Sequence, residues 1–161
     1  MKKVYFYILL VLFLISLALN AFFVYGIFFY RVDNTFITEC GRYNKQEILI
    51  NGKKIIVDVS DDDCKIELGL SGTKELRNNR GMLFVFDKIG NYGFWMKGMN
   101  YPIDVLWVDS DLNIIGIEKN LNPDTYPNIF GQKYLSKYVL ELPVGFLDEN
   151  NILVGNKIYI L

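Results

Sequence analysis

The stretch EILINGKKIIVDV, residues 47–59, decides the fold class of this 161-residue chain. Two runs rich in isoleucine and valine, 47–50 and 53–59, are separated by Asn51-Gly52 alone. Type I′ turns prefer Asn-Gly, because both central residues of that turn need a positive φ. The stretch therefore predicts a β-hairpin and, with it, a domain built mainly of strands.

The residues that follow the hairpin predict one short helix. Ser60 and the three aspartates at 61–63 have the pattern of an N-cap and an acidic first turn, for a helix that ends near Leu68. The aspartates could also bind a cation, but a helix start is the simpler interpretation. Residues 69–80 are typical of a polar loop.

The remainder of the chain predicts more strands. Short apolar or aromatic runs separated by turn residues occupy 82–86, 93–97, 103–108, 113–118, 138–142 and 157–161, with a turn or a single helical turn at 143–151. Strands do not alternate with helices as they do in parallel sheets. We expect a mainly β domain at 47–161, a small barrel-like or rolled antiparallel sheet with one short helix.

Residues 4–30 predict a membrane anchor. This run of 27 residues contains no charged side chain and would form a helix about 40 Å long, enough to cross a hydrocarbon core of about 30 Å. Tyr5 and Tyr25 are spaced as an aromatic belt at two interfaces would be. The chain then divides into an anchor at 1–30, an irregular juxtamembrane stalk at 31–46 and the β domain.

Two lysines set the expected orientation of the anchor. Lys2 and Lys3 precede the apolar run, whereas Arg31 alone follows it before the acidic residues begin. The positive-inside rule places the N-terminus in the cytoplasm and the domain outside the cell membrane. Cleavage after Ser16-Leu17-Ala18, as in a signal peptide, remains the alternative.

Composition excludes several function classes. Once Lys2 and Lys3 are set aside, 15 basic and 18 acidic residues leave a net charge of about −3 and no basic block, which argues against a nucleic-acid partner. The chain contains no histidine, the commonest ligand of zinc and copper and the base of Ser-His-Asp and Cys-His catalysis. We expect no metal and no cofactor.

The two cysteines leave an alternative open. Cys40 and Cys64 are 24 residues apart and form no CxxC motif. In an oxidising exterior they could pair with each other or bridge to another chain, and in a reducing one they would be two unrelated thiols. Sequence alone does not give the connectivity.

Several linked motifs resemble one known family. They are Gly69-Leu70, Gly81-Met82-Leu83-Phe84-Val85-Phe86, Phe94-Trp95-Met96-Lys97, Pro102-Ile103-Asp104-Val105 and Tyr138-Val139-Leu140-Glu141-Leu142-Pro143-Val144-Gly145. In order and spacing they resemble the DUF192 family, and the resemblance covers about 47–161. It implies a small, mainly β, barrel-like domain, often exported or anchored, of unknown activity. The family usually continues Trp-Met-Lys with Asn-Thr, where this chain has Gly98-Met99.

Three polar residues are candidates for catalysis. Asp104 lies in a run that is apolar on both faces, so we expect it to be buried and paired, either with Lys97 in a cleft or with backbone N–H groups of the turn at 98–102. Glu141 lies between Leu140 and Leu142, so alternation sends it to the opposite face, where it would either line a groove with Lys97 and Trp95 or be solvated.

Aromatic residues are candidates for binding. Trp95 lies in the predicted strand 93–97, and Tyr126, Phe130 and Tyr134 lie in the long connection 119–137. Connections of this length often carry function, although a packed flap fits equally well. Asp109-x-Asp111-x-Asn113 resembles the start of a calcium loop but lacks its later ligands, so we expect a hairpin turn there.

Two functions fit these features. We expect a membrane-anchored extracytoplasmic module that binds an envelope glycan, peptide or protein without catalysis. The alternative is an acid-base, hydrolase-like enzyme that uses Lys97, Asp104 and Glu141.

Overall fold

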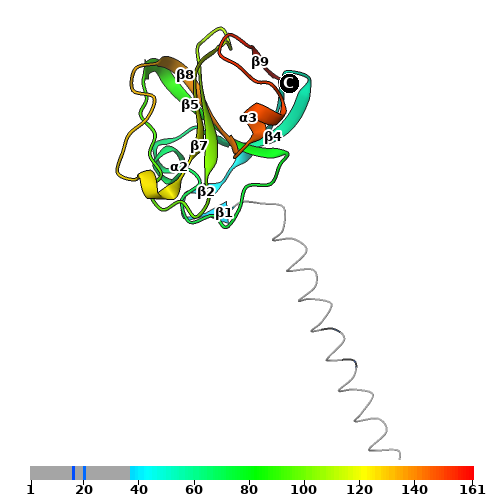
Figure 1. Cartoon of the computed structure of the whole chain (residues 1–161). Helices are drawn as coiled ribbons and strands as arrows, with labels where there is room; N and C mark the ends of the chain where they lie inside the picture. The colour runs from blue at the N-terminus through cyan, green and yellow to red at the C-terminus, as the bar shows by residue number, and fades with distance from the viewer. Residues whose placement is uncertain (1–15, 17–19, 21–36) are drawn as a thin grey trace, which may run out of the picture. The chain divides into compact units, whose positions relative to one another are not determined.

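Seven strands form one curled sheet in the order β7-β6-β8-β5-β4-β3-β9 (Figure 1). The computed structural model describes Ser16, Asn20 and residues 37–161. The strands of the sheet are β3 (Asn44–Ile50), β4 (Lys53–Ser60), β5 (Arg80–Asn91), β6 (Ile103–Val108), β7 (Ile114–Leu121), β8 (Leu135–Pro143) and β9 (Ile158–Ile160). A separate two-stranded sheet holds β1 (Ile37–Thr38) and β2 (Gly41–Arg42), and the helices are α2 (Asp63–Leu68), the 3-10 turn η1 (Pro123–Thr125) and α3 (Phe146–Glu149).

The predicted hairpin is confirmed. Strands β3 and β4 pair antiparallel with Ile50 opposite Lys53, and the turn residues Asn51 and Gly52 have φ of 45° and 79°. A mainly β fold with a short helix is therefore correct, and α3 is the helical turn expected between 143 and 151.

One pair of strands departs from the antiparallel prediction. Strands β4 and β5 run parallel, with Val57 opposite Gly81. A parallel connection needs a crossover of a dozen or more residues, and 61–79, with α2, provide it. The sequence predicts this short helix but does not indicate that it belongs to a crossover between two parallel strands.

The strand predicted at 93–97 is wrong. Strand β5 continues to Asn91 by pairing with β8 past an irregularity between Val85 and Gly90. The residues that follow do not form a strand, and only Phe94 makes a bridge, to Phe130. Gly90 and Asn91, which are typical turn residues and predict a turn between 82–86 and 93–97, thus lie within a strand.

The two edges of the sheet meet at one end, so the sheet forms a half-barrel. Ile114 N–H donates to the carbonyl of Asn156 at 2.8 Å, and Ile158 N–H donates to that of Leu112 at 2.9 Å. These bonds join the start of β7 to the segment that leads into β9.

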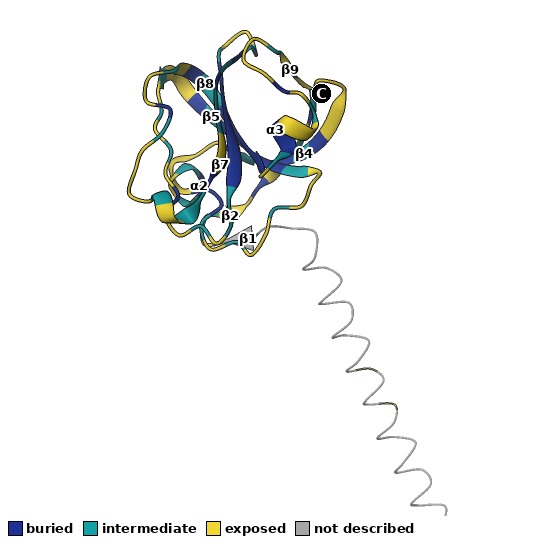
Figure 2. Ribbon diagram, viewed as in Figure 1, coloured by how far each residue is buried: buried dark blue, intermediate teal, exposed yellow. Residues whose placement is uncertain are grey.

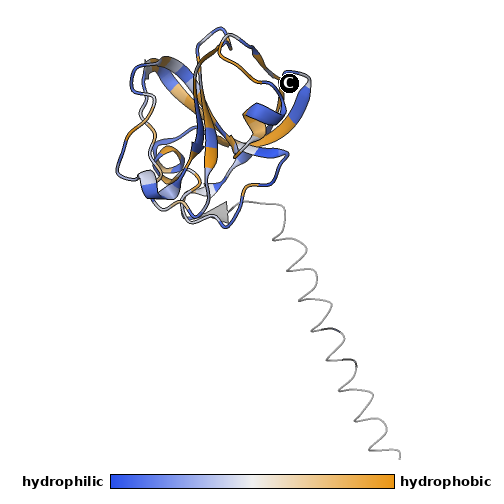
Figure 3. Ribbon diagram, in the orientation of Figure 1, coloured by the Kyte–Doolittle hydropathy of each residue, from blue (hydrophilic) through white to orange (hydrophobic). Residues whose placement is uncertain are grey.

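The middle of the sheet is buried on both faces (Figure 2). One face carries the main hydrophobic core, to which β5, β6 and β8 contribute Leu83, Leu106, Leu140 and Leu142, and α3 contributes Phe146 and Leu147. Alternate residues of the same strands point the other way and are also buried: Met82, Phe84, Phe86, Val105, Trp107 and Val139. Apolar residues accordingly dominate the buried parts of these strands (Figure 3), and the polar residues buried among them are Asp104 in β6 and Ser136 and Glu141 in β8.

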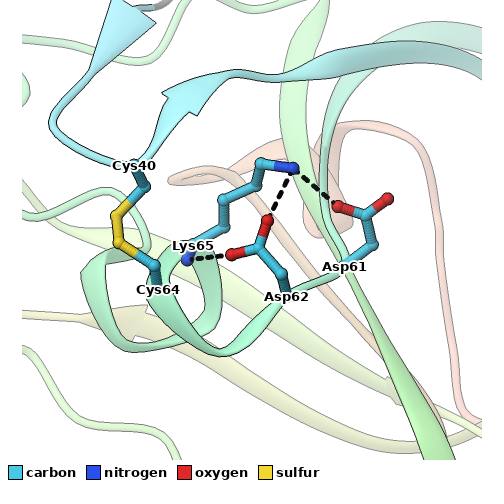
Figure 4. Close-up of a disulfide and its surroundings, with 5 residues drawn as sticks. All are labelled: Cys40, Asp61, Asp62, Cys64 and Lys65. Atoms are coloured by element: carbon cyan, nitrogen blue, oxygen red, sulfur yellow. Dashed lines mark hydrogen bonds and ion pairs between the residues drawn. A yellow bond between two sulfur atoms is a disulfide. The ribbon is translucent and has the colours of Figure 1, made fainter.

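A disulfide attaches α2 to the residues before the sheet. Cys40 and Cys64 are bonded, with their Cα atoms 5.6 Å apart (Figure 4). The Nζ of Lys65 forms ion pairs with Asp61 at 2.8 Å and Asp62 at 2.9 Å. Asp62, rather than the expected Ser60, is the N-cap, and two of the three aspartates thus bind a lysine of the chain itself.

The predicted anchor lies outside the described residues. These exclude 1–15, 17–19 and 21–36, and so Tyr5, Tyr25 and almost all of the run at 4–30. Among the residues that are described, no helix has both the length and the apolar character that a membrane span requires. Within the predicted stalk, residues 41–42 and 44–46 belong to β2 and β3.

Asp104 connects three parts of the fold. Its Oδ1 accepts a hydrogen bond from Asn120 N–H at 2.9 Å, and its Oδ2 accepts one from Leu147 N–H at 3.1 Å. Asn120 lies in a bulge, where two residues of β7 stand opposite Asp104 of β6, and Leu147 lies in the first turn of α3. The side chain is 1% exposed. Asp104 therefore accepts hydrogen bonds from backbone N–H groups, which is one of the two roles expected for it. The donors are Asn120 and Leu147, however, and not residues of the turn at 98–102.

We predict that Asp104→Ala lowers the free energy of unfolding by on the order of 3 kcal/mol, because it removes a charged acceptor from two backbone donors, one of them fully buried. Urea unfolding of the full chain followed by circular dichroism measures this. The matched control is Asp148→Ala, which breaks an exposed ion pair with Lys119 and should cost less than about 1 kcal/mol. A loss for Asp104→Ala no larger than that of the control would contradict the structural role.

Candidate functional site

A pocket of about 160 Å³ opens between α2, β5 and the segment 92–99. It lies on the face of the sheet opposite the main core. Aromatic side chains from β5 and the segment after it form much of its wall, and Glu141 reaches it from β8. The lining residues that the argument uses are Phe84, Phe86, Tyr92, Phe94, Trp95 and Glu141.

Glu141 is a buried carboxyl group without compensation. It is 5% exposed, and its Oε2 has no hydrogen-bond partner among the described residues. Burial disfavours the charged form and raises the pKa of Glu141 to about 8. The group is therefore largely protonated at neutral pH while the pocket is empty. Perturbed carboxyl groups in a pocket are typical of functional sites.

The aromatic rings around Glu141 support one another. Phe84 and Phe94 pack edge to face with centroids 4.7 Å apart, and Phe86 stacks on Tyr92 at 3.5 Å. Phe94 also meets Trp107 edge to face at 6.1 Å. Such pairs hold the rings in defined orientations, so the wall is largely preformed.

Two turns hold the mouth of the pocket together. Ser71 Oγ donates to the carbonyl of Lys97 at 2.7 Å, and Gly72 N–H donates to that of Gly98 at 2.8 Å. Gly98 has a φ of +69°, in the left-handed region that glycine and asparagine adopt most readily. Glycine at position 98 therefore suits this turn, and Met99 beside it lines the pocket.

Trp95 and Tyr126 form an exposed aromatic pair next to the pocket. They are 41% and 46% exposed, with ring centroids 6.3 Å apart. The Nζ of Lys97 lies 5.4 Å from the Trp95 ring centroid and 3.9 Å from Glu67. Two of the four predicted binding residues therefore meet at this surface.

The other two predicted binding residues have structural contacts. Phe130 exchanges two backbone hydrogen bonds with Phe94, at 2.8 and 2.9 Å, which fastens the long connection to the pocket wall. Tyr134 packs against Trp107 with centroids 5.5 Å apart. The connection is thus a packed flap that presents Tyr126.

The predicted catalytic residues do not come together. Asp104 stands opposite Leu142, and Glu141 opposite Val105, so the two carboxyl groups lie on opposite faces of the sheet. Lys97 is 56% exposed as a side chain, and its ion pair is with Glu67, not with Asp104 as we had expected. Of the three, only Glu141 lines the pocket.

Sequence analysis missed the inner wall of the pocket. The predictions assigned Phe84, Phe86 and Phe94 only to strands, and placed Tyr92 in the turn between two of them. Their spacing carried a signal, because alternation along β5 puts Phe84 and Phe86 on one face. The prediction that Glu141 faces away from Leu140 and Leu142 is consistent with the core on the other face.

The resemblance to a calcium loop has a structural explanation. Asp109 Oδ1 accepts hydrogen bonds from Asp111 N–H at 2.9 Å and Asn113 N–H at 2.8 Å, which closes the turn before β7. In the described part of the chain, no three cysteine or acidic side chains are grouped so that they could hold a metal ion.

The expected family resemblance is confirmed by comparison with known proteins. Residues 46–160 match the model of the DUF192 family, whose description reads "Uncharacterized ACR". No curated protein matches the chain.

Solved structures share the fold. A candidate transcription regulator from Sinorhizobium meliloti 1021 is 27% identical, with a TM-score of 0.69 over 73% of this chain and 95% of its own. A protein of unknown function from Novosphingobium aromaticivorans DSM 12444 is 21% identical, with a TM-score of 0.63 over 73% of this chain and 85% of its own. The second likeness shows the fold alone.

We predict that Glu141 makes stability fall as pH rises. The unfolded chain loses this proton near pH 4.5 and the folded chain only near 8, so the folded state binds more protons between these values. Stability should drop by roughly 1.4 kcal/mol per pH unit across that window and level off above it.

The neutral variant Glu141→Gln isolates this effect, since other titrating groups are common to both proteins. Urea unfolding is measured at intervals from pH 5 to 9. The free energy of unfolding of the variant, relative to that of the wild type, should rise by a few kcal/mol over this range. A constant difference between the two proteins across this range would show that Glu141 is not desolvated in solution.

Proposed function

Given that the chain belongs to the DUF192 family, for which no activity is described, we propose its function from its own geometry. It is a membrane-anchored, extracytoplasmic binding module, and the aromatic pocket around Glu141 is its ligand site. The observation that carries this proposal is a largely preformed pocket with a buried, unpartnered carboxyl group and an exposed aromatic pair beside it.

Two observations support the location. The uncharged run at 4–30 behind Lys2 and Lys3 has the length and flanking charge of a single span with the domain outside. The Cys40–Cys64 disulfide is of the kind that persists in oxidising compartments. The lipid bilayer is thus one partner, and an envelope glycan, peptide or protein is the other.

An acid-base enzyme is the second candidate. The pKa of Glu141, raised to about 8 by burial, suits a general acid or base near neutral pH. Its companion would have to be Glu67, the other carboxyl group of the lining. A role in transcription, suggested by the description of the Sinorhizobium protein, is not adopted, because the acidic balance and lack of a basic block favour no contact with DNA.

The location predicts a topology. Protease added outside intact spheroplasts should digest the β domain while a cytoplasmic marker protein survives. Cys40 and Cys64 should react with a maleimide only after reduction. Protection of the domain until the membrane is permeabilised, or a mature N-terminus at Leu19, would contradict the anchored orientation.

The binding role predicts ligand-induced stabilisation. The full chain in maltoside micelles is heated with oligosaccharides, peptides and small organic ions, and at least one class should raise the melting temperature by several degrees, as expected at about 100 times the dissociation constant. Trp95→Ala should abolish the shift. Tyr159→Ala removes another exposed aromatic ring, on β9, and should leave the shift intact. No shift with any class, or an equal loss in both variants, would contradict a ligand site at this pocket.

A further inference from the structure

The lining of the pocket contains two acidic side chains and no basic one. The acidic side chains are Glu141 and Glu67, and no lysine or arginine is among the described lining residues. Glu141 Oε2 is buried and accepts no hydrogen bond from the described residues. A buried acceptor of this kind is stabilised by a donor or by a positive charge brought into the pocket. The pocket therefore favours cations over anions.

Aromatic rings make up the remaining recognition surface. Five of the lining residues are aromatic: Phe84, Phe86, Tyr92, Phe94 and Trp95. Cations are attracted to the faces of such rings within about 6 Å of the centroid. The ring of Trp95 already illustrates this attraction, since the ammonium of Lys97 lies 5.4 Å from its centroid.

The supply of acceptors distinguishes between kinds of cation. A primary ammonium carries three N–H donors, each of which needs an acceptor when it is buried. Among the buried side chains of the described lining, Glu141 alone is polar, whereas Leu70, Phe84 and Phe86 offer no acceptor. A quaternary ammonium has no N–H group and makes no such demand.

The volume of the pocket fits a small head group. At about 160 Å³ it is close to the engineered cavity of about 150 Å³ that accommodates benzene, so it would take a group of about six heavy atoms. The geometry points to this pocket as a site for a quaternary ammonium head group, with Glu141 as its counter-ion and the aromatic rings as its walls. This inference rests on the proposed binding function and specifies its ligand.

Binding of such a cation is coupled to loss of a proton. Because burial raises the pKa of Glu141 to about 8 in the empty pocket, the cation must displace a proton at neutral pH. The other titratable groups near it are Glu67 from α2, Tyr92 after β5 and Tyr101, whose own pKa is raised by burial and, less, by the charge of Glu141. Neighbouring positions on β5 and β6, Met82 and Val105, do not titrate.

The test is a calorimetric titration of the full chain in maltoside micelles with tetramethylammonium chloride, against sodium chloride at equal ionic strength. Affinity should rise about tenfold from pH 6.5 to 7.5 and level off above about 8, since only the ionised carboxylate pairs with the cation. Glu141→Gln should lower the affinity at pH 8 at least tenfold and flatten the pH profile. Glu149→Gln removes an equal charge from α3, outside the pocket, and should behave as wild type.

A second variant keeps the test decisive if Glu141→Gln does not fold. Trp95→Leu, at an exposed position, should weaken tetramethylammonium binding about tenfold while circular dichroism stays unchanged. The absence of saturable binding by the wild type, or wild-type affinity and pH profile in Glu141→Gln, would overturn the inference.

Further experiments distinguish a soluble from a lipid source of the head group. They also distinguish failure of the ligand assignment from failure of the proposed ligand site. Competition with tetramethylammonium by free choline supports a soluble cation, and competition by phosphatidylcholine vesicles but not by choline supports a lipid head group. Another ligand class could stabilise the wild type but not Trp95→Ala while tetramethylammonium does not bind. This result would contradict only the assignment of a quaternary ammonium ligand. If no ligand class binds, the proposed ligand site is contradicted as well.

Discussion

Burial on both faces of β6 and of residues 139–143 of β8 is the constraint on which the rest of the structure depends. With apolar contacts above and below these strands, a polar side chain in either one cannot reach water along the strand and must find its partners within the fold. Asp104 and Glu141 are the two acidic residues in this position, and adjacent register puts them on opposite faces. Their environments therefore differ completely, although they are close in the sheet.

The two carboxyl groups show opposite ways of meeting that constraint. Asp104 accepts two backbone N–H groups and joins a bulge of β7 to the first turn of α3, so its burial is compensated by bonds that the fold needs. Glu141 has no such compensation at Oε2 and stays protonated near neutral pH because of its burial. A cost of this kind is common where a residue serves function rather than stability. The uncompensated group is accordingly the one that lines the pocket.

Sequence reasoning succeeded where a local rule governs and failed where distant residues decide. Asn51-Gly52 specifies its turn by backbone preference alone, and the alternation around Glu141 follows from strand geometry. The partners of Asp104 lie 16 and 43 residues along the chain, and no local pattern indicates them. The parallel pairing of β4 and β5 was missed for the same reason, since it depends on where the crossover through α2 ends. The rings of Phe84 and Phe94 were visible as aromatic residues, but their meeting at one pocket depends on the loop that binds Phe94 to Phe130.

Helix α2 links the pocket to the residues nearest the predicted membrane segment. Its last residues line the pocket, whereas its first turn is held by the Cys40–Cys64 disulfide and by the pairing of Lys65 with Asp61 and Asp62. A helix of only six residues has little stability of its own, so these attachments, rather than helix propensity, hold it in place. The pocket wall formed by α2 is therefore stabilised from the N-terminal side of the domain, while the wall formed by β5 and β8 is stabilised by the sheet. A ligand in the pocket would contact both walls, so its affinity would depend on the position of α2 relative to the sheet.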